Sequence, residues 1–196
     1  MRTKKYLAIA IILTIVSGAL FISCGTAKDG SSTRAGQLIP YSFFNVSFGT
    51  HYKMINHYHG WNSFDHLTDE ELAPIAGRKI KSRVSIGPSS FGSIMWDEAV
   101  YLCDFKDSFF CIGFKNKFSS FDKAYSLYSE LKAALDKKYG PGRTIGYKTT
   151  YGDPRSRSII LVMIPYYGKE DSSCCELFYL DDRIYRKDTA EAENEL

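Results

Sequence analysis

The chain has 196 residues, of which 25 are basic and 22 are acidic. Three of the basic residues and none of the acidic ones lie in residues 1–23, so the 173 residues that follow carry no net charge. This balance excludes the concentrated positive field that nucleic-acid binding requires. The length after residue 23 predicts one domain, large enough to bury its own core.

The N-terminus has the layout of a secretory signal. Arg2, Lys4 and Lys5 precede an apolar run over residues 6–22, and small residues surround Cys24. A basic start, an apolar core and a small-residue end are the features that direct a chain out of the cytoplasm.

The stretch LFISCG at residues 20–25 resembles the lipobox of bacterial lipoproteins. In that family the chain is cut before the cysteine, which becomes lipidated. The resemblance implies a signal peptide at residues 1–23 and a lipid anchor on Cys24, with an extracytoplasmic location at the cell membrane or outer membrane. Gly25 lacks the Asp that retains some lipoproteins at the inner membrane, which favours the outer membrane. An uncleaved anchor or an ordinary signal peptide is the alternative.

The remaining boundaries follow from composition. Residues 24–37 are small, polar and glycine-bearing, which predicts a flexible linker. Residues 38–187 form the predicted single domain, and residues 188–196 an acidic tail.

The first half of the domain is predicted to hold four strands and a short helix. A strand at 41–48 precedes a helix at 50–58, and alternation of polar and apolar residues predicts a strand at 79–86. Two further strands, at 99–105 and 108–118, flank a turn at Lys106 and Asp107 and form a predicted hairpin.

A long helix at 120–139 is the firmest element. Its apolar residues recur at helical spacing, and Asp122 suits the positive N-terminal end. Gly140 and Pro141 then provide a stop.

Strands at 158–164 and 176–180 follow, with a turn at Asp181 and Asp182 into residues 184–185. The order β-α-β-β-β-α-β-β predicts an α+β fold. We expect an antiparallel sheet of about five to six strands with the long and the short helix packed on one face.

Four cysteines lie inside the domain, where an extracytoplasmic location permits disulfides. A three-residue hairpin turn would place Cys103 opposite Cys111, close enough for a bridge. A two-residue turn would put the pair on opposite faces, and the sequence leaves this choice open. Cys174 and Cys175 are adjacent and would alternate faces in a strand.

All four histidines, His51, His57, His59 and His66, fall within sixteen residues near several carboxylates. Such a cluster is a weak candidate for a zinc-type metal site. The alternative is chance clustering in a polar stretch.

A second polar feature is the basic run Arg78, Lys79, Lys81 and Arg83. It predicts the solvent side of a strand, with a patch for lipid headgroups or acidic polymers as the alternative.

No catalytic or cofactor motif stands out. The leading hypothesis is a membrane-anchored envelope lipoprotein whose small domain binds a protein or glycan, or supports assembly of an envelope complex. The alternative is a small envelope hydrolase or metal-dependent enzyme that uses the His51–His66 region.

Overall fold

The computed structural model describes residues 39–59, 75, 77–167 and 172–186. The predicted signal peptide with Cys24, the linker and the acidic tail lie outside these residues. Among the described helices, none is both long enough and apolar enough to cross a membrane.

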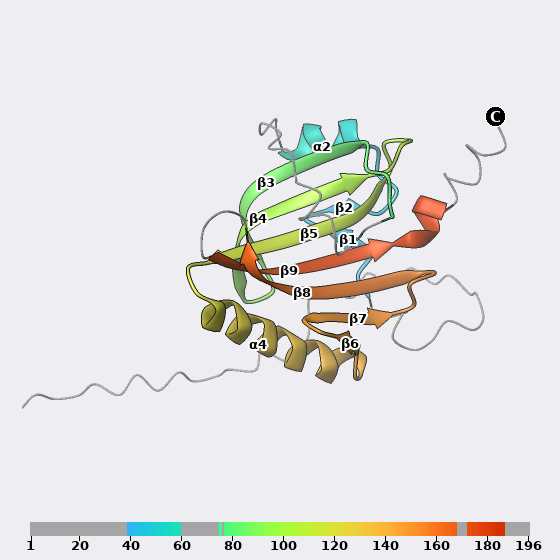
Figure 1. The fold of residues 1–196 in the computed structure, drawn as a ribbon. Coiled ribbons are helices and arrows are strands. Elements are labelled where there is room, and N and C mark those ends of the chain that lie inside the picture. Colours follow the sequence, from blue (N-terminus) through green and yellow to red (C-terminus); the bar gives the residue numbers. More distant parts are fainter. Residues whose placement is uncertain (1–38, 60–74, 76, 168–171, 187–196) are drawn as a thin grey trace, which may run out of the picture. The chain divides into compact units, whose positions relative to one another are not determined.

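A seven-stranded antiparallel sheet forms the body of the domain (Figure 1), in the order β3-β4-β5-β9-β8-β7-β6. Its strands are β3 (Ser82–Phe91), β4 (Ile94–Cys103), β5 (Phe109–Phe118), β6 (Arg143–Ile145), β7 (Lys148–Gly152), β8 (Arg157–Tyr167) and β9 (Ser172–Asp181). Two meanders, β3 to β5 and β6 to β9, meet where β5 pairs with β9. Helix α4 (Phe121–Tyr139) is the connection between the meanders.

One face of the sheet, here called the first face, is covered by three elements. These are α4, helix α2 (Tyr52–His59) and a small hairpin of β1 (Ser42–Phe43) and β2 (Val46–Ser47). The Phe43 ring lies 4.9 Å from the Tyr179 ring of β9, measured between centroids. Ala124, Tyr128 and Leu135 are the buried residues of α4 in the same core.

Helix α4 confirms the predicted long helix. It begins after Ser120, whose extended backbone marks the N-terminal boundary, and Asp122 lies in its first turn. The backbone N–H of Gly140 donates to the Asp136 carbonyl at 2.9 Å, and φ of 83° at Gly140 ends the helix. Only glycine adopts this left-handed conformation without strain.

The opposite face, here called the second face, is also buried over the central strands. Its core cluster includes Val100 on β4, Cys111 on β5, Ile160 on β8 and Phe178 on β9. Ile75 and Ile80 before β3 and a helical turn at residues 182–186 contribute to this cluster from outside the sheet.

The α+β class, the antiparallel sheet and the long helix are therefore as predicted, but the strand count and order are not. The expected strand at 41–48 is a tight two-strand hairpin, because Phe44 and Asn45 adopt left-handed φ values of 47° and 68°. Residues 184–185 belong to a helical turn and not to a strand. Strands β6 and β7 were not predicted. β6 is exposed at every position and has no buried face, and β7 has only two buried residues, Thr149 and Tyr151.

Gly113, at the centre of β5, provides a test of this packing. A Cβ atom there would lie 2.8 Å from the Phe178 ring, so we expect Gly113→Ala to lower the free energy of unfolding by about 1–3 kcal/mol. Alanine is otherwise favoured over glycine in a strand, so the loss must be steric. Urea unfolding of the full chain in detergent, followed by circular dichroism, measures it.

Phe178→Leu supplies the control in a double-mutant cycle. Removing the ring relieves the contact, so the double variant should lose less stability than the sum of the two single variants. Full additivity, or a Gly113→Ala variant as stable as the wild type, would contradict the packing.

Candidate functional site

The strand register creates a row of side chains across the second face. Glu98 on β4 is opposite Lys115 on β5, and Lys115 is opposite Glu176 on β9. The row continues through Val162 on β8 to Lys148 on β7. Charges alternate along its first three members, so neighbouring strands attract each other across the row.

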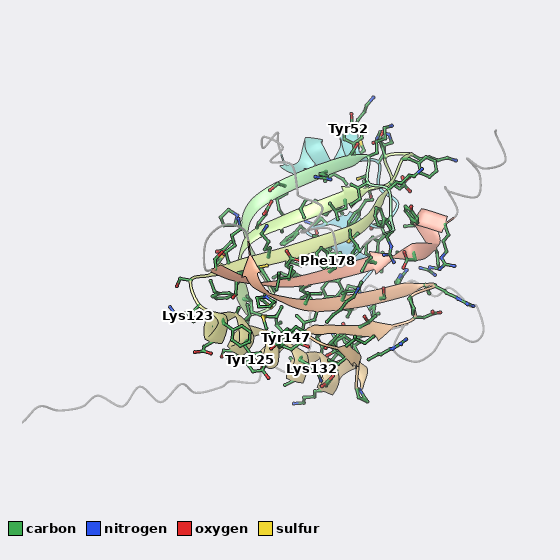
Figure 2. All side chains as sticks on the ribbon, in the orientation of Figure 1. Tyr52, Lys123, Tyr125, Lys132, Tyr147 and Phe178 are labelled. Atoms are coloured by element: carbon green, nitrogen blue, oxygen red, sulfur yellow. The ribbon has the colours of Figure 1, made fainter. Side chains whose placement is uncertain are left out.

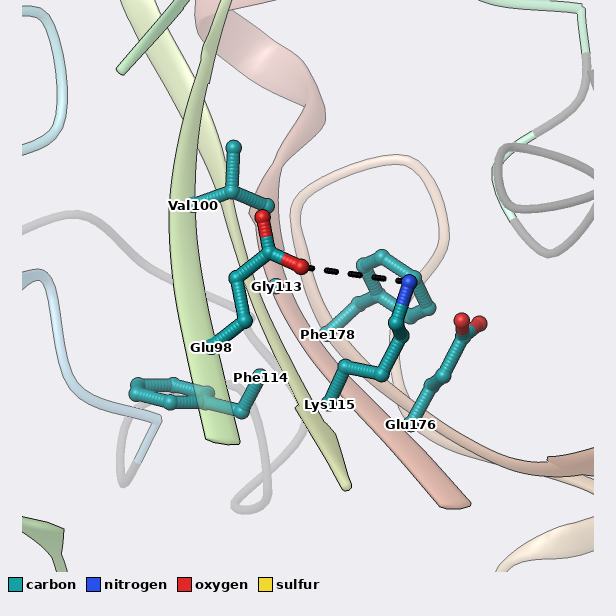
Figure 3. Close-up of a pocket in the computed structure, with 7 residues that line it drawn as sticks. All are labelled: Glu98, Val100, Gly113, Phe114, Lys115, Glu176 and Phe178. Carbon is teal, nitrogen blue, oxygen red and sulfur yellow. Dashed lines mark ion pairs between the residues drawn. The ribbon is translucent and has the colours of Figure 1, made fainter. Parts of the chain in front are cut away.

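The charged row borders a hollow next to Phe178 and Gly113 (Figure 3). Lys115 lies between Glu98 and Glu176, with its Nζ atom 3.8 Å from the Glu98 carboxylate. Lys115 is 7% exposed and Glu176 is 2% exposed, so two opposite charges are held side by side inside the fold. A buried charge requires a neighbouring group of opposite charge, because it has lost its contact with water.

This hollow is too small for a substrate site. Its cavity volume is about 20 Å³. Pockets that bind small molecules usually measure about 300–1,000 Å³. The charged row of Glu98, Lys115 and Glu176 is therefore better explained as a structural feature of the sheet than as a catalytic acid–base site.

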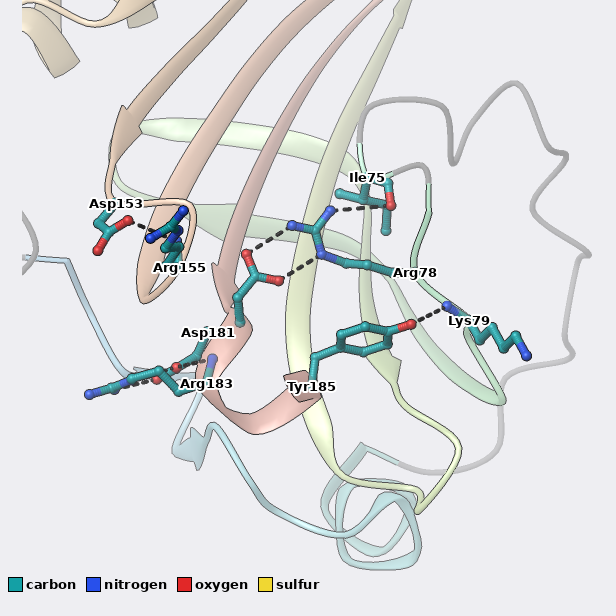
Figure 4. Close-up of polar contacts among 9 residues, drawn as sticks. Ile75, Arg78, Lys79, Asp153, Arg155, Asp181, Arg183 and Tyr185 are labelled. Atoms are coloured by element: carbon teal, nitrogen blue, oxygen red, sulfur yellow. Dashed lines mark hydrogen bonds and ion pairs between the residues drawn. The ribbon is translucent and has the colours of Figure 1, made fainter. Parts of the chain in front are cut away.

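A second polar cluster lies where β9 ends (Figure 4). Arg78 donates two hydrogen bonds to the Asp182 carboxylate, at 2.7 and 2.8 Å, and a third to the carbonyl of Ile75 at 3.3 Å. Tyr185 accepts a hydrogen bond from the backbone N–H of Lys79 at 2.9 Å. These contacts fasten the segment before β3 to the helical turn after β9.

Asp181 is the centre of a neighbouring ion-pair group. It accepts hydrogen bonds from Arg157 at 2.9 Å and from Arg183 at 2.6 Å. Burial alone would raise the pKa of the Asp181 carboxyl, but the hydrogen bonds and charges of Arg183 and Arg157 outweigh burial and lower it.

Two of the four cations in the predicted basic run pair with carboxylates of the domain. Arg78 pairs with Asp182 at 2.7 Å and Lys81 with Asp107 at 2.8 Å, while the Lys81 side chain stays 55% exposed. A patch for lipid headgroups or acidic polymers stays a prediction.

Three aromatic rings, two of them exposed, lie where α4 meets the β6–β7 turn, and we call Phe121, Tyr125 and Tyr147 the aromatic corner. Tyr125 on α4 and Tyr147 in the turn lie next to each other, with ring centroids 6.3 Å apart (Figure 2). Phe121 and Tyr125 are nearly parallel, at 8° and 5.8 Å. Tyr147 stands at 71° to Phe121 and 79° to Tyr125. The three rings thus form two walls at nearly a right angle.

The corner is open to solvent and rigidly supported. Tyr125 is 46% exposed and Tyr147 is 42% exposed. The carbonyl of Tyr147 accepts a hydrogen bond from the Met163 N–H at 3.0 Å, and Gly146 turns the chain with φ of 59°. Behind the rings, the hydroxyls of Tyr128 and Thr149 are hydrogen-bonded at 2.8 Å, which joins the helix to the hairpin.

The aromatic corner was not predicted from the sequence, although the sequence holds part of the signal for it. Phe121 and Tyr125 are four residues apart, which places them on one side of a helix. Tyr147 comes from the hairpin that was not predicted. The glycine before Tyr147, in a two-residue turn between Ile145 and Lys148, is the signal that would have revealed that hairpin.

The histidines are only partly described. His51 is exposed and its Nδ1 atom accepts a hydrogen bond from the Lys53 N–H at 3.3 Å. His57 and His59 belong to α2, and His66 lies outside the described residues. Within the described part of the chain, no three His, Cys, Asp or Glu side chains are grouped to hold a metal ion. The metal-dependent enzyme remains a prediction.

The cysteines of the domain are free and buried. Cys103 pairs with Phe109, and Cys111 pairs with Leu102, because an irregularity in the ladder leaves Phe110 without a partner. The two thiols consequently belong to cores on opposite faces, which is the second of the two arrangements that the sequence left open, and both are free. Burial raises the pKa of Cys175 to about 12, so this thiol remains protonated and unreactive at neutral pH.

The lowered pKa of Asp181 predicts a specific dependence of stability on pH. The Asp181 carboxylate stabilises the fold fully above the pKa that an Asp has in the unfolded chain, which is about 4. This stabilisation is lost as the pH falls through the lower pKa that Asp181 has in the folded state. We expect Asp181→Asn to be less stable than the wild type by about 1–3 kcal/mol at neutral pH, with the difference shrinking in acid. Urea midpoints from about pH 7 to about pH 3 measure this.

Glu130→Gln is the control for Asp181→Asn, because Glu130 is exposed on α4. Its stability should follow that of the wild type at every pH. A constant difference between Asp181→Asn and the wild type across the whole range would argue against the lowered pKa.

Comparison of the chain with protein-family models, with curated proteins and with solved structures finds no match.

Proposed function

We propose that this chain is a lipid-anchored protein of the bacterial cell envelope, and that its domain binds a partner through the aromatic corner. The lipobox-like stretch ending at Cys24 supports the location and the anchor. The exposed rings of Tyr125 and Tyr147, ordered by the partly buried ring of Phe121, support the binding role.

Aromatic residues gathered at one place on the surface are typical of binding sites. Tyrosine and phenylalanine bring large contact area with few rotatable bonds, and tyrosine also carries a polar tip. Binding through such rings loses little conformational entropy when they are already held in place. The hydrogen bond between Met163 and Tyr147 and the contacts between neighbouring rings provide that order before any partner arrives.

The surface around the corner is also compatible with a neutral partner. Asp122 and Lys123 are both exposed at the start of α4, so the rim carries both signs of charge. With no net charge after residue 23, long-range attraction contributes little, and recognition depends on contact.

Lipidation is tested by Cys24→Ala. We expect this variant to lose incorporation of a palmitate analogue and to leave the membrane fraction, because each buried CH₂ of an acyl chain contributes about 0.8 kcal/mol to membrane binding. Cys175→Ala is the matched control and should be labelled like the wild type. Equal labelling of Cys24→Ala and the wild type would contradict a lipid anchor at this residue.

The binding surface is tested by photo-cross-linking in cells. A benzophenone amino acid in place of Tyr147 should give an adduct after irradiation. The same amino acid in place of Tyr41 is the control, because Tyr41 is 41% exposed but lies beside Arg157, at the other end of β8 from Met163. Equal yields at both positions, or no adduct at either, would contradict a binding role for the corner.

A further inference from the structure

We propose that the aromatic corner binds the flat face of an uncharged sugar ring in a glycan chain. This inference rests on the proposed function and adds the chemical class of the ligand. It comes from the geometry of Phe121, Tyr125 and Tyr147.

The shape of the corner suits a sugar ring. A pyranose ring has an apolar face of C–H bonds and a rim of hydroxyl groups, so it is held by an aromatic face below it and a second contact at its side. Phe121 and Tyr125 lie within 8° of parallel, and Tyr147 stands at 79° to Tyr125. The corner thus offers surfaces for both the face and the side of one ring.

The exposed area of the corner suits a small ligand. An aromatic side chain has about 150–250 Å² of surface, so tyrosines exposed by 46% and 42% present together roughly 200 Å². A stable protein interface buries about 800 Å² on each partner. The aromatic corner alone therefore fits a small rigid ligand better than a protein surface.

The hydroxyls of the two tyrosines favour a polar ligand. Within the described residues, the hydroxyls of Tyr125 and Tyr147 make no hydrogen bond, and both rings lie against neighbouring aromatic rings. An aliphatic or lipid partner would leave these hydroxyls unsatisfied on binding, whereas the hydroxyls of a sugar can donate to them or accept from them.

The test is calorimetry of the full chain in detergent with four uncharged hexasaccharides, namely cellohexaose, chitohexaose, mannohexaose and xylohexaose. We expect at least one to bind saturably in the millimolar range or tighter. Tyr125→Ala should weaken that binding by at least about tenfold, which corresponds to about 1.4 kcal/mol. Absence of saturable binding by all four would overturn the inference.

Substitutions at Tyr147 separate ring stacking from general apolar contact. Tyr147→Leu keeps an apolar side chain but removes the flat ring, so it should weaken binding about tenfold, whereas Tyr147→Trp should stay within about threefold of the wild type. Tyr41→Ala is the exposure-matched control and should bind normally. Normal binding by Tyr147→Leu, or an equal loss in Tyr41→Ala, would overturn the inference.

The cross-linking experiment distinguishes failure of this inference from failure of the proposed function. A discrete protein adduct at position 147, including a dimer of this chain, or an adduct of lipid size, without binding of any hexasaccharide, would overturn the glycan while leaving a binding role for the corner. Absence of both adduct and sugar binding would overturn both.

Discussion

Burial of the central strands on both faces of the sheet is the constraint on which the rest of the structure depends. In β5, every residue from Phe109 to Asn116 is buried. A strand of this kind needs apolar residues in near-continuous sequence and a cover for each face. Helix α4 and the β1–β2 hairpin cover the first face, while the segment around Ile75 and the turn at residues 182–186 contribute to the second.

The same constraint explains the charged row. Lys115 and Glu176 lie on central strands, where an unpaired charge would be costly, and each is opposite a residue of opposite charge. A slip of one residue between β5 and β9 would turn Lys115 away from Glu176 and place Phe114 or Asn116 opposite Glu176, depending on its direction. The row therefore adds specificity to a register that hydrophobic residues on both faces would otherwise leave weakly defined.

The elements that could be predicted from the sequence are those fixed by interactions between residues close in the chain. Asp122, Gly140 and Pro141 act within a few residues, so α4 was predicted nearly to the residue. The hairpin of β4 and β5 was found for the same reason, but its register was not. That register depends on a five-residue connection in which Asp104 accepts hydrogen bonds from the N–H groups of Lys106 and Ser108 and Asp107 adopts φ of 62°. These contacts cannot be predicted from composition. They fix the register that places Cys103 and Cys111 on opposite faces of the sheet.

The aromatic corner shows the same division between local and tertiary information. The stacked pair on α4 follows from helical spacing alone, but the third ring arrives only when the β6–β7 hairpin docks on the helix. That docking depends on a chain of hydroxyls, since Thr149 contacts both Tyr128 at 2.8 Å and Thr144 at 3.0 Å. It also depends on Tyr151, which donates to the Asp136 carboxylate at 2.9 Å. The contacts that join helix and hairpin therefore also set the angle between the two walls, and the geometry of the corner is a property of the folded domain rather than of either segment.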